Sequence, residues 1–278
     1  MNEENSPRTA SELLFEEYLR DRELSCEYEP EIEGTTKRPD YQVSMGGAAA
    51  FFEVKEFEPQ NTPQVGSFDP YPRIRSKINE ARKKFKNFTD RMCVLVLANP
   101  RHAALVLLEP LFVFCAMLGD LGWTMPFDPE TGGLDDSRMT QTFLSGGRMV
   151  RYKNGQAIAP QNTTISAVCV LGHVAEGSRR LEILRARRER ETGRPLAPQQ
   201  LLRESVGTAA DPSIRRLRVV VCENPYAATP LTHSFGRGPH DERFGLRDGR
   251  LCRLFVGSAL ETLEANEREA GITIRDGF

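Results

Sequence analysis

The chain has 278 residues, of which 39% are hydrophobic and 27% are charged, and its formal net charge is −2. These fractions are ordinary for a soluble globular protein, and the length allows a substantial core. No apolar run approaches the roughly 20 residues that a membrane-spanning helix needs, and the polar, acidic start does not have the pattern of a secretory signal. Six scattered cysteines form no Cys-x-x-Cys pair, which argues against a zinc site or a disulfide framework. We therefore expect a cytoplasmic protein with no membrane partner.

The first predicted element is a helix over residues 11–19. Its apolar residues recur at helical spacing (Leu14, Phe15, Tyr18 and Leu19), and Ser11 is a candidate N-cap. Glu12 and Glu16 lie one turn apart on this helix. Taken alone, Glu12 is typical of a solvated first-turn residue that the helix dipole favours.

Three strands are predicted next, over residues 26–31, 41–44 and 51–55. Met45-Gly46-Gly47 supplies the turn between the second and third, because glycine tolerates the positive φ of a tight hairpin. In the third strand, alternate side chains share a face, so Glu53 and Lys55 point away from Phe52 and Val54. Burying such a carboxylate and ammonium is costly unless they are paired or bind a metal.

The hairpin brings Asp40, thirteen positions before Glu53, back beside that glutamate. Either residue alone has a simpler explanation, since Pro-Asp is a common turn starter and Glu-x-Lys a common surface ion pair. Together, the two carboxylates and the Val54 carbonyl make an oxygen-rich site that suits Mg²⁺ or Mn²⁺. Lys55 would then hold or deprotonate the attacking water.

The region after the third strand contains a proline-rich loop over residues 58–72 and a helix over 73–88. A buried central strand follows over 92–98, and one or two short helices over 103–118. Residues 71–91 carry eight basic side chains against Glu80 and Asp90. Because this helix follows the candidate site, we expect it to contact a phosphate backbone. The nucleic-acid-binding candidates are Arg73, Arg75, Lys77, Lys83 and Lys84.

The second half of the chain is less informative. Residues 119–160 are rich in turns and suggest no role. Strands are predicted over 164–171, 217–222 and 251–256, and helices over a basic stretch near 178–190 and over 198–205. No repeat or linker separates the halves. We therefore predict an α/β fold in which residues 1–118 form the core and 119–278 form an α/β elaboration of the same domain.

The stretch from Ser11 to Phe57 resembles the PD-(D/E)xK nuclease superfamily. The resemblance rests on Arg38-Pro39-Asp40, on Glu53-Val54-Lys55 and on the preceding helix. It implies a restriction-endonuclease-like core of helix, three-stranded meander, helix and strand. It also implies that Asp40 and Glu53 bind metal, that Lys55 positions the water, and that Glu12, with Glu16 as the reserve, completes the shell. The next helix lacks the Gln-x-x-x-Tyr pattern of many exonuclease-type members.

The leading interpretation is a Mg²⁺-dependent endonuclease that hydrolyses DNA phosphodiester bonds, in restriction, phage defence or DNA repair. One alternative is a non-catalytic nucleic-acid-binding or assembly protein with the same fold. Another is an RNA-cleaving nuclease, because metal-assisted hydrolysis does not itself discriminate the sugar. The sequence is compatible with a homodimer or with a partner protein.

Overall fold

The computed structural model describes residues 7–57, 71–100, 109–124, 140–154, 156–194 and 198–272. Helix α1 (Ala10–Asp21) opens the fold. Its N-cap is Thr9 rather than Ser11: the Thr9 hydroxyl accepts from the Glu12 N–H, and the Glu12 carboxylate accepts from the Thr9 N–H. The Ser11 hydroxyl instead donates to Glu56, 45 residues later, at 3.0 Å. The helix therefore begins at Ala10, one residue earlier than predicted, because Thr9 caps it and Ser11 makes a tertiary contact instead.

Three antiparallel strands follow the helix, as predicted, although the first ends at Tyr28 rather than at residue 31. They are β1 (Cys26–Tyr28), β2 (Tyr41–Met45) and β3 (Ala48–Glu56). The β2–β3 turn has positive φ at both Gly46 (55°) and Gly47 (93°), the conformation that a two-residue hairpin with matching twist requires. This turn fixes the register of β2 against β3.

The main sheet has eight strands in the order β1-β2-β3-β4-β9-β10-β11-β12. Strands β3, β4 and β9 run parallel to one another, β10 and β11 are also parallel, and the remaining neighbours are antiparallel. The protein is therefore a mixed α/β fold, and its sheet takes strands from before and after residue 118. The later strands are β4 (Met92–Ala98), β9 (Ala167–Val174), β10 (Arg216–Glu223), β11 (Glu242–Arg247) and β12 (Arg250–Val256).

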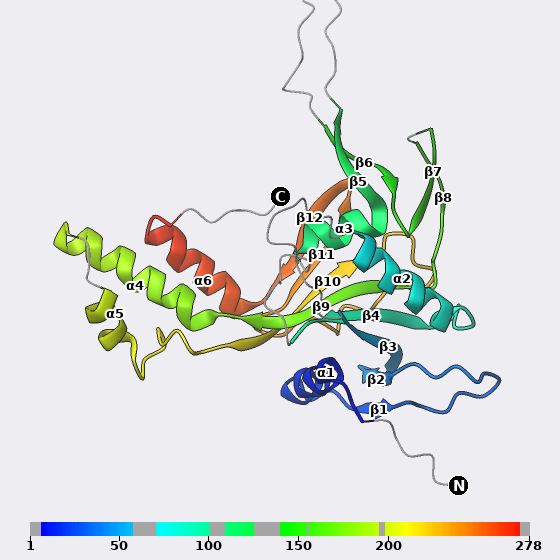
Figure 1. Ribbon diagram of the computed structural model, residues 1–278, viewed down its shortest axis with the longest axis horizontal. Coiled ribbons are helices and arrows are strands. Elements are labelled where there is room, and N and C mark those ends of the chain that lie inside the picture. Colours follow the sequence, from blue (N-terminus) through cyan, green and yellow to red (C-terminus); the bar gives the residue numbers. More distant parts are fainter. Residues whose placement is uncertain are drawn as a thin grey trace, which may run out of the picture.

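Helices cover both faces of this sheet (Figure 1). On one face, Phe15 of α1 packs among Tyr41, Phe52 and Phe235. The opposite face is covered by α2 (Tyr71–Phe85) and α3 (Pro110–Leu118). Every residue of β4 is buried, as expected for a central strand with helices on both sides. The predicted strand over 92–98 is confirmed.

The described parts of residues 119–160 form strands that sequence patterns did not reveal. They are two antiparallel pairs, β5 (Gly119–Thr124) with β6 (Thr140–Gly146) and β7 (Val150–Lys153) with β8 (Gln156–Pro160). The β7–β8 hairpin is largely exposed. A half-solvated two-stranded ribbon has few buried positions, so its apolar alternation is weak.

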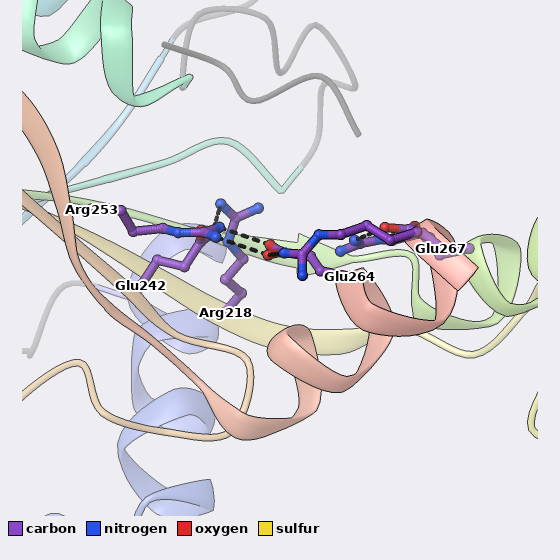
Figure 2. Close-up of polar contacts among 7 residues, drawn as sticks. Arg218, Glu242, Arg253, Glu264 and Glu267 are labelled. Atoms are coloured by element: carbon purple, nitrogen blue, oxygen red, sulfur yellow. Dashed lines mark hydrogen bonds and ion pairs between the residues drawn. The ribbon is translucent and has the colours of Figure 1, made fainter. Parts of the chain in front are cut away.

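Three helices extend beyond the sheet: α4 (Glu176–Thr192), α5 (Pro198–Ser205) and α6 (Ser258–Glu269) (Figure 1). Figure 2 shows how arginine–carboxylate pairs connect the sheet with α6. Arg253 of β12 binds Glu264 of α6 at 2.7 and 2.8 Å and Glu242 of β11 at 3.1 Å. Glu267 of α6 binds Arg179 of α4.

Strand β11 and helix α6 were not predicted. Glu242 is buried at the start of β11, and α6 buries Glu264 and Glu267, so charged side chains occupy positions that sequence patterns reserve for apolar residues. Their arginine partners come from other elements. Part of the predicted helical stretch over 103–118 and most of the predicted loop over 58–72 lie outside the described residues. In the part of the chain that the structure describes, no helix is both long and apolar enough to cross a membrane.

Candidate functional site: a buried carboxylate pair with two lysines

The register of the β2–β3 hairpin places Asp40 next to Glu53. Tyr41, the first residue of β2, is opposite Phe52. Continuing the register by one residue puts Asp40 opposite Glu53, where cross-strand neighbours have Cβ atoms about 4.5–5.5 Å apart. Both side chains are buried, with exposed fractions of 8% for Asp40 and 2% for Glu53.

Asp40 also closes the end of the strand pair. The β2–β3 ladder ends before Val54, and the Val54 N–H donates to Asp40 Oδ2 at 2.8 Å in place of a backbone partner. In an antiparallel pair, the N–H and C=O of one residue point to the same neighbour. The Val54 carbonyl is therefore directed to the side on which Asp40 lies.

Strand alternation separates the site from the α1 core, as predicted. Phe52 and Val54 pack in the cluster that contains α1, whereas Phe51 packs against α2 on the other face. Glu53 and Lys55 share the Phe51 face, and Lys55 Nζ lies 2.6 Å from Glu53 Oε1. The structure thus brings Asp40, Glu53 and Lys55 together on the α2 side of the sheet.

Lys84 completes the cluster from α2, the helix that covers this face of the sheet. Its Nζ lies 3.3 Å from Asp40 Oδ1 and 3.2 Å from Glu53 Oε2. The two lysines therefore divide the oxygens of Glu53 between them, and only Lys84 bridges both carboxylates. Two ammonium groups balance two carboxylates in this cluster.

Burial dominates the electrostatics of the pair. It raises the pKa of Glu53, and the Asp40 carboxylate raises it further, against the opposing effect of Lys55 and Lys84. For Lys84, burial disfavours the ammonium, but attraction to Glu53 and Asp40 outweighs this effect and raises its pKa. Lys84 consequently remains charged at neutral pH.

One acceptor at the site lacks a well-aligned donor. Glu53 Oε2 is buried and, although Lys84 Nζ is within ion-pair distance, it receives no hydrogen bond of good geometry. A buried oxygen in this state is available to a cation. Within the described ranges, no group of three or more His, Cys, Asp or Glu side chains gathers to hold a metal. The pair suits a cation such as Mg²⁺, which is commonly bound by one or two carboxylates plus waters and substrate phosphates.

The structure does not bring Glu12 to this cluster. Its carboxylate accepts a hydrogen bond from the Thr9 N–H at 2.6 Å and so folds back on its own helix. Moreover, α1 packs on the Phe52 face of the sheet, whereas Glu53 lies on the α2 face. The expectation that Glu12 faces Asp40 and Glu53 does not match this arrangement. Glu16, the reserve residue, accepts from the Tyr41 hydroxyl at 3.0 Å.

The predicted basic residues of α2 have different surroundings. Arg75 pairs with Asp120 of β5 at 2.6 Å, and Lys77 pairs with Glu80 at 3.2 Å. Lys83 is exposed, and Arg73 is half-buried. Sequence reasoning assigned Lys84 to this basic group and missed its contact with the carboxylates. Its position beside the buried Ala81 and Phe85 on the helix was the available signal.

Comparisons with known proteins show no family. No protein-family model matches the chain, and the comparison with curated proteins gave no match. The chain is similar to a solved structure described as Pyrococcus furiosus SfsA in complex with Ca²⁺, with 20% identity and a TM-score of 0.17. The likeness covers 32% of this chain and 38% of that chain. A likeness of this score supports no argument about fold or function.

Proposed function

We propose that this protein is a Mg²⁺- or Mn²⁺-dependent nuclease that hydrolyses DNA phosphodiester bonds endonucleolytically, built on a restriction-endonuclease-like core of the PD-(D/E)xK type. The observation that supports this most is the cluster of Asp40, Glu53 and Lys55 beside a hairpin that follows a helix. The order of α1, β1–β3, α2 and β4 agrees with that core.

The residues present fit a hard divalent cation. Asp40 and Glu53 would hold it through carboxylate oxygens that already face a common cationic group, with the Val54 carbonyl on the same side. When bound, such a cation lowers the pKa of a coordinated water and stabilises charge on a phosphate. Contacts with Lys55 and Lys84 orient the buried Glu53 carboxylate.

Lys55 would position the attacking water as an ammonium, or accept its proton in the neutral amine form. Its side chain is 25% exposed, whereas that of Glu53 is 2% exposed, so the ammonium lies between the buried carboxylate and solvent. The basic side chains of α2, among them Arg73 and Lys83, would lie along the phosphate backbone of the DNA. The proposed role of Lys55 does not involve the apolar contacts of Phe52 and Val54 on the opposite face.

The test is nicking of supercoiled plasmid by the full chain in Mg²⁺, in Mn²⁺ and in EDTA. We expect cutting with either metal, none in EDTA, and a loss of about 10²–10⁴ in rate for Lys55→Ala. Lys153→Ala, at an exposed position of β7, is the matched control and should cut like wild type. Equal activity of wild type and Lys55→Ala would contradict the assignment.

One observation favours a second candidate, a non-catalytic nucleic-acid-binding protein. Lys55 and Lys84 together neutralise both carboxylates, so the cluster is charge-balanced without a metal. This alternative predicts binding of DNA without cutting under any metal condition. Parallel assays with RNA test the third alternative, an RNA-cleaving enzyme.

A further inference from the structure

We infer that the Lys84 ammonium occupies the position between Asp40 and Glu53 that a divalent cation would take. In this position Lys84 competes with the cation for the two carboxylates. This inference rests on the proposed function, because it concerns the same pair of carboxylates. It assigns to one α2 lysine a role distinct from that of Lys55 and from that of the other basic residues of the helix.

The geometry distinguishes the two lysines. Lys84 Nζ lies at nearly equal distances, 3.3 and 3.2 Å, from one oxygen of Asp40 and one oxygen of Glu53. Lys55 Nζ contacts the other Glu53 oxygen at 2.6 Å. A cation that joined Asp40 and Glu53 would approach their oxygens to about 2.0–2.6 Å, so it and the Lys84 ammonium could not share the position. Lys55 could keep its contact.

The backbone of α2 holds Lys84 over the site. Its neighbour Phe85 and Ala81, one turn earlier, are fully buried in the core between the helix and the sheet. The Lys84 side chain is 32% exposed, so its ammonium can move out to solvent when a divalent cation binds between Asp40 and Glu53. Lysine has a long flexible stem, which allows this movement without a shift of the helix.

The competition has a directional consequence. Removing the Lys84 charge leaves two buried carboxylates with Lys55 alone, and an added cation then meets no repulsion from a second ammonium. The affinity for a divalent cation should therefore increase. A lysine with a purely structural role would instead leave the affinity unchanged, or lower it by loosening the site.

The experiment measures Mn²⁺ binding to the full chain by isothermal titration calorimetry at neutral pH, without nucleic acid. We expect Lys84→Met to bind Mn²⁺ about tenfold or more tightly than wild type, since a charge at contact distance from both carboxylates is removed. Lys86→Met is the matched control: it removes an equal charge from an exposed position two residues along the chain and should leave the affinity within about twofold of wild type. Lys84→Arg keeps the charge and should stay closer to wild type than Lys84→Met.

The outcomes separate this inference from the proposed function. Wild type that binds Mn²⁺ through Asp40, with Lys84→Met binding equally or more weakly, overturns the role of Lys84 and leaves the nuclease proposal standing. Absence of Mn²⁺ binding in wild type, Lys84→Met and Lys84→Gln alike overturns both. Circular dichroism establishes that each variant is folded, and Lys84→Gln replaces Lys84→Met if the latter is not.

Discussion

Substitutions of Asp40 can separate what this residue does for the fold from what it would do for a metal. Its Oδ2 accepts the buried N–H of Val54 at 2.8 Å, where the β2–β3 ladder has ended. Asp40→Asn keeps an oxygen that can accept this hydrogen bond, whereas Asp40→Ala removes it. Both variants relieve Glu53 of the neighbouring negative charge, so their difference reports what the rest of the side chain contributes, chiefly the Val54 hydrogen bond.

The magnitude follows from the burial of the donor. An N–H left without a partner inside the protein costs about 1–3 kcal/mol, and Val54 is 6% exposed. We therefore expect Asp40→Ala to be less stable than Asp40→Asn by about 1–3 kcal/mol. At about 2–4 °C for each kcal/mol in a chain of this size, the melting temperatures should differ by roughly 2–12 °C.

Urea denaturation in EDTA, followed by circular dichroism, measures the free energies of unfolding of the two variants. Mn²⁺ titration of the same samples should then show that both have lost most of the wild-type affinity. Equal stability of the alanine and asparagine variants would refute the structural role assigned to the Val54 hydrogen bond. Wild-type Mn²⁺ affinity in both would refute the assignment of Asp40 as a ligand.

Three further predictions concern stability. Because the pKa of Glu53 is raised, its contribution to stability is lost as pH rises through that pKa. The urea midpoint of Glu53→Gln should therefore increase relative to wild type from about pH 4.5 upwards in EDTA, and a constant difference would refute this. Arg253→Met should lower the free energy of unfolding by about 1–3 kcal/mol. This is less than the loss of a fully buried pair would cost, because the Arg253 side chain is 34% exposed. An unchanged urea midpoint would show that the pairing of Arg253 with Glu264 contributes little to stability. Gly177→Ala should lower the free energy of unfolding by about 1–3 kcal/mol or more, since a Cβ there would lie 1.6 Å from the Asp211 carbonyl oxygen. The control Gly172→Ala should not destabilise the protein, because a Cβ at Gly172 has no neighbour within 4 Å. Similar melting temperatures for the two variants would contradict the close packing at Gly177.

Local sequence patterns were sufficient for the elements that form the candidate site. Gly46 and Gly47 have the positive φ that a two-residue hairpin needs, so the turn set the register and placed Asp40 beside Glu53. The buried strand over 92–98 and the helix over 198–205 also match their predicted bounds. These features depend on neighbours in the chain, which is why periodicity and turn residues reveal them.

Elements stabilised by distant partners did not follow from the sequence. Strand β11 and helix α6 bury Glu242 and Glu264, which is tolerable because Arg253 lies between them (Figure 2). No local pattern indicates that a buried carboxylate will find such a partner.

The sequence by itself determined the strand alternation that sets Glu53 and Lys55 on one face and the hairpin that returns Asp40 to them. Only the tertiary structure decided which other charges join this cluster. Packing of Phe85 beneath α2 brings Lys84 to both carboxylates, while the capping box of α1 turns Glu12 away. The physical reason is that strand geometry depends on adjacent residues, whereas the approach of a helix to a sheet depends on the whole core that holds it.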